Sequence, residues 1–295
     1  MEKICDLHTH SVFSDGTWTP TQLIEEAERI GLSAIALTDH NTVDGLHEFL
    51  SAAQGKNLEA IPGVEFSTDY MGMDIHVVAH YVMPSHFSEV TRLMEEGRRK
   101  KEESNLRLIE NLSKIGFSIN YEAMRDAAPG GQINRAHIAA AMLKNGWVSS
   151  MQDAFNRYLE PKCGLYTAPK RPDIFEMIRF IRSIGAVPIL AHPFLKLTLD
   201  QLREFLPEAV KAGLLGMETE YVSFDEETTR MAKGLAREHG LLESGGSDFH
   251  GDNKPGIFLG VGRGNLHVPL SFRDGIRQAA SLNGTNWLPD NFRKI

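Results

Sequence analysis

The chain has 295 residues, of which 42% are hydrophobic and 24% charged, which is the composition of a globular domain. Its formal net charge of −8 argues against a protein that coats nucleic acid through bulk positive charge. No apolar run approaches the ~18–20 residues of a membrane span, so we expect no membrane association. The N-terminal "MEKICDLHTH" lacks the pattern of a signal peptide, and two cysteines make no disulfide framework, so we expect a cytoplasmic protein.

Strand-like and helix-like segments alternate along most of the chain. Thr19 is suited to cap a first helix, Pro20 to open it and Gly31 to end it. Strands are expected near residues 3–8, 33–38, 58–62, 74–81, 186–191, 215–219 and 241–245. Strands that alternate with helices predict an α/β protein with a mostly parallel sheet or an α/β barrel.

One region, from about Ser88 to Cys163, interrupts this alternation with helices alone. Its segments are "EVTRLMEEGRRKKEESNLRLIENLSKIGF", "INRAHIAAAMLKNG" and "SMQDAFNRYL". We interpret residues 88–163 as a helical insertion domain over the mouth of a barrel domain that comprises residues 1–87 and 164–295. The basic run from Arg98 to Lys101 is interpreted as a solvated helix face paired with nearby glutamates.

Histidines and carboxylates gather at the carboxyl ends of the expected strands, where loops build the active sites of α/β barrels. Residues two apart on a strand share a face, so His8 and His10 can converge on one ion. Imidazole and carboxylate without thiolate are ligands for manganese, iron or zinc. Without a metal, burying the set would leave costly unsatisfied groups together. The set comprises His8, His10, Asp39, His40, Glu65, His76, His192, Asp248 and His250.

Six short motifs in order resemble the PHP (polymerase and histidinol phosphatase) family of metal-dependent phosphoesterases. They are "DLHTHSVFSDG", "ALTDHNTVDG", "IPGVEFS", "DIHVVAHY", "ILAHPF" and "GGSDFHG", and they cover residues 4 to about 262. The resemblance implies a distorted seven-stranded (β/α) barrel that holds two or three divalent ions, either manganese, iron or zinc.

The resemblance also implies a role for each residue. His8, His10, Glu65 and Asp248 would hold a first ion, and Glu65 would bridge to a second ion held by His76 and His192. Asp15, His40 and His250 would hold a third ion, where Asp15 replaces a histidine found in other branches of the family. His80 is expected to support the neighbouring ligands or to be structural, rather than to bind a metal itself. Asp6 and Asp39 are expected to orient imidazoles by accepting their second N–H.

A second resemblance lies in the insertion, where "GGQINRAHIAAAMLKNGWVSSMQDAFNRYL" is similar to the family branch that acts on nucleotides. That branch contains nucleotide bisphosphate phosphatases and a 5′ to 3′ trimmer of short RNAs. Arg135 and His137 match its phosphate-binding positions, and a planar guanidinium suits bidentate binding of phosphate. We therefore expect both residues to bind the substrate and to support catalysis.

These observations together predict a metal-dependent phosphoric ester hydrolase. Its substrate is expected to be a phosphate monoester of a nucleotide, of the 3′,5′-bisphosphate type, attacked by a metal-bridging hydroxide near Glu65. The alternatives are a 5′-3′ exonuclease on short RNA, a hydrolase of a cyclic, sugar or histidinol phosphate, and a non-catalytic metal-binding module. The expected partner is thus a small nucleotide or a short oligonucleotide, and no obligate protein partner is inferred. The group that protonates the leaving oxygen is left open between His137 and a metal-bound water.

Overall fold

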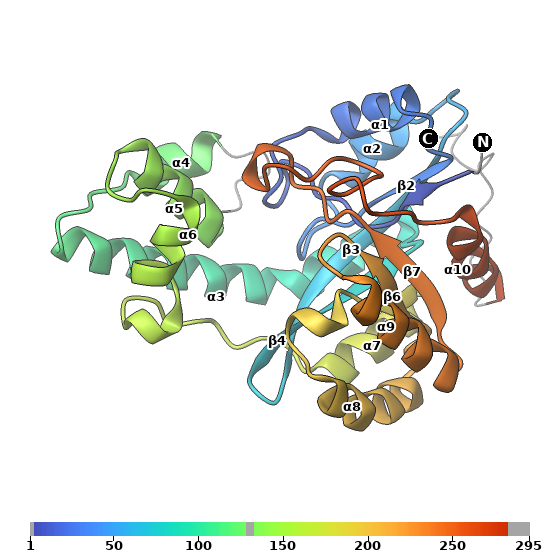
Figure 1. Cartoon of the computed structure of the whole chain (residues 1–295). Coiled ribbons are helices and arrows are strands. Elements are labelled where there is room, and N and C mark those ends of the chain that lie inside the picture. The colour runs from blue at the N-terminus through green and yellow to red at the C-terminus, as the bar shows by residue number, and fades with distance from the viewer. Residues whose placement is uncertain (1–2, 128–132, 283–295) are drawn as a thin grey trace.

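The computed structural model describes residues 3–127 and 133–282 of the chain (Figure 1). Seven strands occupy the seven expected places: β1 Cys5–Asp6, β2 Ala34–Leu37, β3 Glu59–Tyr70, β4 Met73–His80, β5 Val187–Leu190, β6 Gly216–Tyr221 and β7 Leu242–Gly246. The α-helices are α1 Pro20–Arg29, α2 Leu46–Ala52, α3 Phe87–Lys114, α4 Tyr121–Ala127, α5 Arg135–Lys144, α6 Met151–Ala154, α7 Ile174–Ser183, α8 Leu199–Ala212, α9 Glu226–Glu238 and α10 Leu270–Leu282.

The strands form one sheet in the order β1 to β7, which curls into a nearly closed barrel. The seam between the first and last strands is bridged by backbone hydrogen bonds from Leu7 N to Gly245 O (3.1 Å) and from Asp248 N to His8 O (2.9 Å). The sheet is parallel except at β4, which pairs antiparallel with both β3 and β5. The expected (β/α) barrel is therefore confirmed, with the reversal of one strand as its main distortion.

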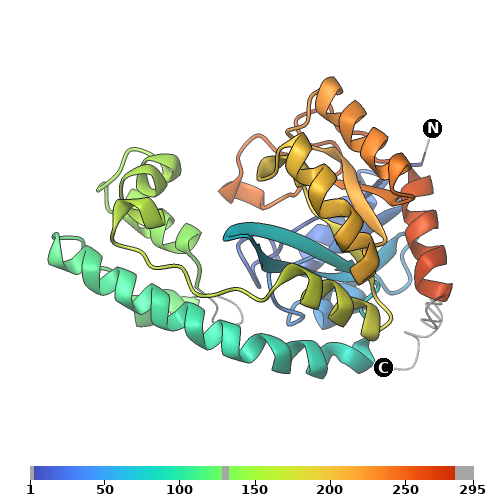
Figure 2. The same cartoon turned by 90° about the horizontal axis from the view of Figure 1, so that it is seen from below.

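The helices lie where the local sequence places them. Thr19 and Gln22 form a reciprocal capping box at the start of α1, with Pro20 in the first turn. Gly31 follows the end of α1 with φ +79°, a left-handed conformation that favours glycine. Seen from below, the helices surround the strands of the barrel, and α3 extends away from them to one side (Figure 2). In the described part of the chain, no helix is long and apolar enough to cross a membrane.

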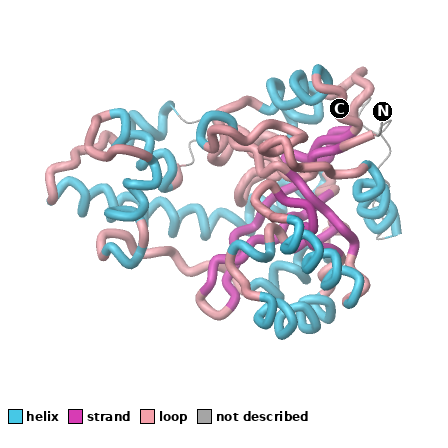
Figure 3. The backbone as a smooth tube through the Cα atoms, in the orientation of Figure 1, coloured by secondary structure: helices cyan, strands magenta, loops and turns pink. Residues whose placement is uncertain are grey.

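The segment between β4 and α7 is built from helices and loops, as Figure 3 shows. The long helix α3 joins two hydrophobic clusters, because Val90 and Met94 pack into the barrel core while Leu108 and Leu112 pack into a second cluster. That second cluster also contains Ile138 of α5, and a π-helical turn, Phe155–Leu159, continues α6. The division at residues 88 and 163 remains a prediction. Residues 128–132 of the segment and 283–295 of the proposed barrel domain lie outside the described residues.

Candidate metal centre

The strand ends bring all nine predicted ligands to one end of the barrel. The reversed direction of β4 explains how His76, early in its strand, reaches the same edge as residues that follow parallel strands. Glu65 lies inside β3 rather than after it, because β3 continues to Tyr70 as one arm of a hairpin. The other ligands follow strands: His8, His10 and Asp15 follow β1, His40 follows β2, His192 follows β5, and Asp248 and His250 follow β7.

Glu65 is the centre of this cluster and is almost completely buried. Its Oε1 lies 2.8 Å from Nδ1 of His76 and 2.9 Å from Nε2 of His192. Its Oε2 lies 3.2 Å from three imidazole nitrogens: Nε2 of His8, Nε2 of His10 and Nδ1 of His40. One carboxylate therefore faces five imidazoles with both oxygens, which is the arrangement of a bridging ligand.

A second group of donors lies beside the first. Asp15 Oδ1 lies 3.2 Å from His250 Nε2, and Asp15 Oδ2 lies 3.7 Å from His40 Nε2. His10 connects the two groups, because its Nδ1 is 3.6 Å from Asp15 Oδ1 while its Nε2 faces Glu65. Ligand atoms of His10, Asp15, His40 and His250 all lie within 4.8 Å of one another.

Asp248 presents a single oxygen to the cluster. Its Oδ1 lies 3.2 Å from His10 Nε2 and 3.7 Å from His8 Nε2. The other oxygen, Oδ2, accepts a hydrogen bond from the Tyr221 hydroxyl (2.7 Å) and another from Lys254 Nζ (2.5 Å). These two donors, which the sequence analysis did not single out, fix the orientation of the carboxylate.

Burial and neighbouring charges shift the pKa values of the cluster strongly. Burial alone would raise the pKa of Glu65, but the imidazoles of His40, His76 and His8 outweigh it and hold that pKa well below its usual value. Burial alone would also raise the pKa of Asp15, but the imidazoles of His250 and His40 outweigh burial and hold that pKa well below its usual value. Both carboxyl groups are therefore ionised at neutral pH, as a metal ligand requires.

The donor atoms fit divalent metal ions. Atoms bonded to one ion at about 2.0–2.2 Å stand roughly 3.0–3.5 Å apart along the edges of a tetrahedron or octahedron. The contacts among His8, His10 and Glu65 fall in this range, including 3.1 Å between the two Nε2 atoms. Nδ1 of His40 is buried without a hydrogen bond and faces Glu65. Burial lowers the pKa of His40 to about 3, which keeps its ring neutral.

Backbone strain occurs at two of these positions. His192 has φ +29° and Asp248 has φ +52°, whereas a residue with a side chain seldom adopts positive φ. Each follows a strand and turns its side chain back over the end of the barrel. Strain of this kind costs of order 1–3 kcal/mol and clusters at functional sites.

The expected orienting roles of Asp6 and Asp39 are wrong. Asp6 accepts hydrogen bonds from the backbone and hydroxyl of Ser247 and from Gly260 N, and Asp39 accepts them from Ser11 and Ser14. Both carboxylates tie loops together and contact no imidazole nitrogen through a hydrogen bond. The orienting contact comes instead from Glu218, whose Oε1 lies 2.7 Å from His8 Nδ1. His80 makes a structural contact, because its Nε2 donates a hydrogen bond to the backbone oxygen of Leu7 at 2.8 Å.

Arg135 and His137 lie in the first turn of α5. The Arg135 guanidinium lies 4.5 Å from the ring centre of Tyr166 and donates to Leu159 O at 3.0 Å, while Glu160 stands 3.6 Å away. Nδ1 of His137 accepts a hydrogen bond from Asn134 N at 3.1 Å, which leaves Nε2 to carry the ring proton. The Gly130, Gly131 and Gln132 that open the quoted motif lie outside the described residues.

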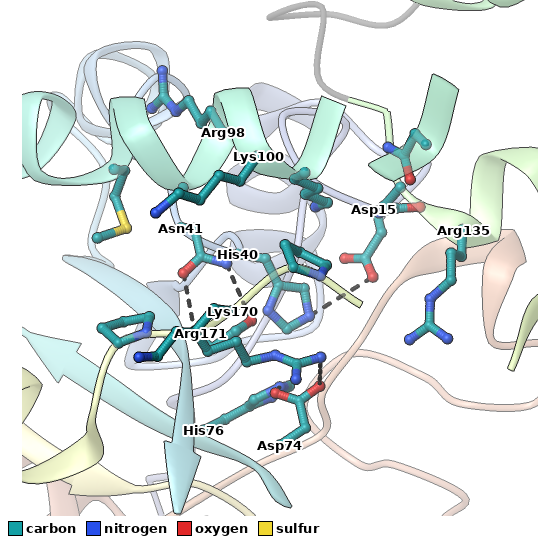
Figure 4. Close-up of a pocket in the computed structure, with 18 of the residues that line it drawn as sticks. Asp15, His40, Asn41, Asp74, His76, Arg98, Lys100, Arg135, Lys170 and Arg171 are labelled. Atoms are coloured by element: carbon teal, nitrogen blue, oxygen red, sulfur yellow. Dashed lines mark hydrogen bonds and ion pairs between the residues drawn. The ribbon is translucent and has the colours of Figure 1, made fainter. Parts of the chain in front are cut away.

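A cavity of about 510 Å³ connects the metal cluster to the helical segment (Figure 4). On the barrel side it is lined by Asp15, His40 and His76, and on the helical side by Arg135 and Tyr166. Its cationic lining residues are Arg98, Lys100, Lys101, Arg135, Lys170 and Arg171. The interpretation of the basic run as a solvated face paired with glutamates is therefore wrong for Arg98 and Lys101, which line this cavity and pair with no glutamate among the described residues. It holds for Arg99, which pairs with Glu103 at 2.8 Å, and for the pairing of Lys100 with Glu96 at 2.5 Å, although Lys100 also lines the cavity.

A barrel whose open end gathers imidazoles and carboxylates beside a basic cavity defines a metal-dependent hydrolase of anionic substrates.

Comparisons with known proteins agree with this class. A family model named PHP domain matches residues 6–161. A 5′-3′ exoribonuclease of Haemophilus influenzae is 33% identical over 251 residues, 85% of this chain and 91% of the relative. A 3′,5′-nucleoside bisphosphate phosphatase of Chromobacterium violaceum is 29% identical over 86% of this chain and 90% of the relative.

Solved structures extend the agreement to the fold. A Bifidobacterium adolescentis protein assigned as a metal-dependent phosphoesterase has a TM-score of 0.83 and 28% identity, covering 94% of this chain and 96% of that one. The chain therefore belongs to the PHP family. It is a metal-dependent phosphoric ester hydrolase.

Proposed function

We propose that this hydrolase removes one phosphate from a nucleotide of the 3′,5′-bisphosphate type. The observation that carries the proposal is a cavity that joins the metal cluster to a set of cationic side chains. Its volume of about 510 Å³ falls within the ~300–1,000 Å³ range of small-ligand sites. A substrate with one phosphate at the metals and further negative charge elsewhere matches this distribution.

We assign the nine clustered residues as ligands of two or three manganese, iron or zinc ions. When bound, such ions make water acidic enough to be a nucleophile at neutral pH and offset the charge of the phosphate oxygens. Glu65 holds the donors together from the floor of the site. The chain's other residues then bind, orient and neutralise the substrate.

Arg135 and His137 are proposed to bind the phosphate from the helical side. The ring of Tyr166 and the carbonyl of Leu159 hold the Arg135 guanidinium in place before the substrate arrives, so little side-chain entropy is lost on binding. His137 has its Nδ1 engaged by the backbone, so its Nε2–H is free to donate to a phosphate oxygen or to the leaving oxygen.

A second candidate function is trimming of short RNA from its 5′ end. The similarity to the Haemophilus influenzae exoribonuclease, at 33% identity, favours it. Such a substrate presents a 5′ terminal phosphate and the first phosphodiester, which lie at the same 5′ and 3′ positions as the two phosphates of a nucleotide bisphosphate, although the diester carries one negative charge fewer. The two activities require the same ligands and the same cationic cavity, so they differ in which ester bond lies over the metals.

The proposal is tested with a matched panel in manganese. The panel holds adenosine 3′,5′-bisphosphate, AMP, a short 5′-phosphorylated RNA, a cyclic phosphate and histidinol phosphate, and the released phosphate or nucleotide is measured. We expect preference for the bisphosphate, loss of turnover in Asp248→Asn, and a KM about tenfold higher in Arg135→Ala, since one charged hydrogen-bond donor is removed. Arg99→Ala, on the exposed face of α3, is the matched control and should behave as the unchanged protein.

Other outcomes point to other functions. Preference for the RNA would establish the second candidate, and turnover of only the cyclic or non-nucleotide esters would overturn the nucleotide assignment. Metal binding without turnover of any ester would indicate a non-catalytic module.

A further inference from the structure

Six cationic side chains line the cavity, and they differ in what neutralises them. Four have a carboxylate within ion-pair distance: Arg98 with Asp44 (3.6 Å), Lys100 with Glu96 (2.5 Å), Arg135 with Glu160 (3.6 Å) and Arg171 with Asp74 (2.8 Å). Over residues 3–127 and 133–282, the structure gives no ion pair to Lys101 or Lys170. Lys170 is exposed to water, whereas Lys101 is half-buried, so Lys101 is the cation whose charge is least compensated.

The sequence of α3 offers Lys101 no glutamate four residues away with which to form an ion pair. In α3, Lys100 and Arg99 each have a glutamate four residues away, which is the spacing that pairs side chains on a helix surface. Lys101 instead has Gly97 four residues before it and Asn105 four residues after it, and both line the same cavity. A Cβ at Gly97 would meet no atom within 4 Å. The face of α3 that carries Lys101 therefore borders open space.

The charged groups around Lys101 come from separate elements. Burial lowers the pKa of Lys101, Arg135 and Arg171 act in the same direction, and Asp15 and Asp74 oppose them. Asp15 is a proposed metal ligand, and Asp74 is already paired with Arg171. Lys101 of α3, Arg135 of α5 and Arg171 before α7 thus line the same cavity as the proposed metal ligands, and among the described residues only Lys101 of the three has no carboxylate within ion-pair distance.

We propose that Lys101 binds the phosphate group of the substrate that is not cleaved, and that it thereby sets the specificity for substrates with two phosphate groups. This inference rests on the proposed function. Metal ions held by the nine clustered residues would neutralise the reacting phosphate, so Lys101 contributes to binding of the second phosphate rather than to the chemical step. That group is either a monoester, as in a nucleoside bisphosphate, or the next phosphodiester of an oligonucleotide.

The test compares Lys101→Met with Arg99→Met, a matched loss of one positive charge at the neighbouring position of the same helix. The reporter assay is hydrolysis of p-nitrophenyl phosphate, which has a single phosphate, by the whole chain in manganese. Adenosine 3′,5′-bisphosphate and a 5′-phosphorylated dinucleotide compete with it, so inhibition constants are obtained whether or not they are good substrates. Unchanged reporter kinetics also show that the variants fold.

Lys101→Met should leave kcat and KM for the reporter near those of the unchanged protein and raise the inhibition constant of at least one competitor by roughly tenfold or more. A rise for both competitors points to the 5′ monoester that they share, a rise for the bisphosphate alone points to its 3′ monoester, and a rise for the dinucleotide alone points to its diester. An unchanged inhibition constant for both competitors overturns the inference, and so does an equal rise in the KM of the reporter. Failure of the proposed function would appear separately, in the substrate panel of the unchanged protein.

Discussion

Glu218 holds two proposed metal ligands at once. Its Oε1 lies 2.7 Å from His8 Nδ1, and its Oε2 accepts a hydrogen bond from the backbone N–H of His192 at 2.5 Å. Burial would lower the pKa of His8, but Glu218 and Glu65 outweigh it and raise that pKa well above its usual value. With Nδ1 engaged in this way, the ring turns its Nε2 toward Glu65, as carboxylate partners of metal-binding histidines commonly do.

Glu218→Gln is therefore expected to weaken metal binding by roughly 10–100-fold. The neutral amide cannot stabilise the His8 ring as a carboxylate does. Competition with a coloured chelator measures the affinity directly, independently of turnover. The control is Glu220→Gln on the same strand, because Glu220 pairs with Lys233 instead (2.5 Å). Equal metal affinity in the two variants would remove Glu218 from this role.

The start of α5 is the element that positions the proposed phosphate-binding residues. Asn134 caps the helix by accepting hydrogen bonds from Ala136 N and His137 N, and its Nδ2 donates to Ser14 O of the first barrel loop at 3.4 Å. His137 returns the contact by accepting from Asn134 N. One residue thus fixes the helix end and the link to the loop that carries Asp15 through its side chain, and the tautomer of His137 through its backbone N–H.

Replacing this cap, Asn134→Ala, should lower the free energy of unfolding by about 1 kcal/mol and raise KM with a smaller effect on kcat. Loss of the cap lets the first turn of α5 fray, so Arg135 and His137 are no longer held in place. Denaturant unfolding and steady-state kinetics provide the two measurements. Asn145→Ala at the other end of α5 removes a similar side chain from an exposed position and should leave KM unchanged. A KM that stays constant in Asn134→Ala would contradict the positioning role.

Across the whole molecule, strand positions followed from the sequence, whereas strand direction and register did not. The alternation of apolar and polar segments placed all seven strands and eight of the nine clustered residues, Asp15 came from the family resemblance, and the pattern could not show that β4 runs backwards. Nor could the sequence pattern show that Glu218, rather than Glu220, contacts a histidine of the cluster. In a regular strand both would share a face, and an irregularity in the pairing of β6 with β7 between these positions sends them to different partners. Long-range pairing decides such details, and local sequence does not encode it.

The concentration of imidazoles makes the stability of the metal-free molecule depend on pH. Burial would lower the pKa values of His10 and His76, but neighbouring carboxylates outweigh it and raise them to about 9 and about 10. The unfolded value is 6.5, so the protonated rings stabilise the fold fully below pH 6.5. This contribution to the free energy of unfolding is lost as the pH rises above 6.5 and passes the two folded-state pKa values, about 9 for His10 and about 10 for His76.

When a chelator keeps the protein free of metal, the Tm should therefore fall as the pH rises above 6.5. With manganese the trend should weaken or reverse, because divalent ions require neutral imidazoles and compete with protons for them. Calorimetry at matched pH values, with and without metal, measures both trends. A Tm in chelator that stays level or rises over this range would contradict the assignment of these rings as charged in the metal-free state.

The seam of the barrel has a consequence for how the protein is made. Asp6 and Ser247 are hydrogen-bonded although they stand 241 positions apart, and the adjacent His8, His10, Asp248 and His250 are separated by nearly as much chain. During synthesis, the first two histidines thus leave the ribosome long before their partners exist. The proposed centre can be completed only when the last strand docks against the first, so metal capture there would be a late event of folding. Ions bound by these residues would then link the two ends of the barrel.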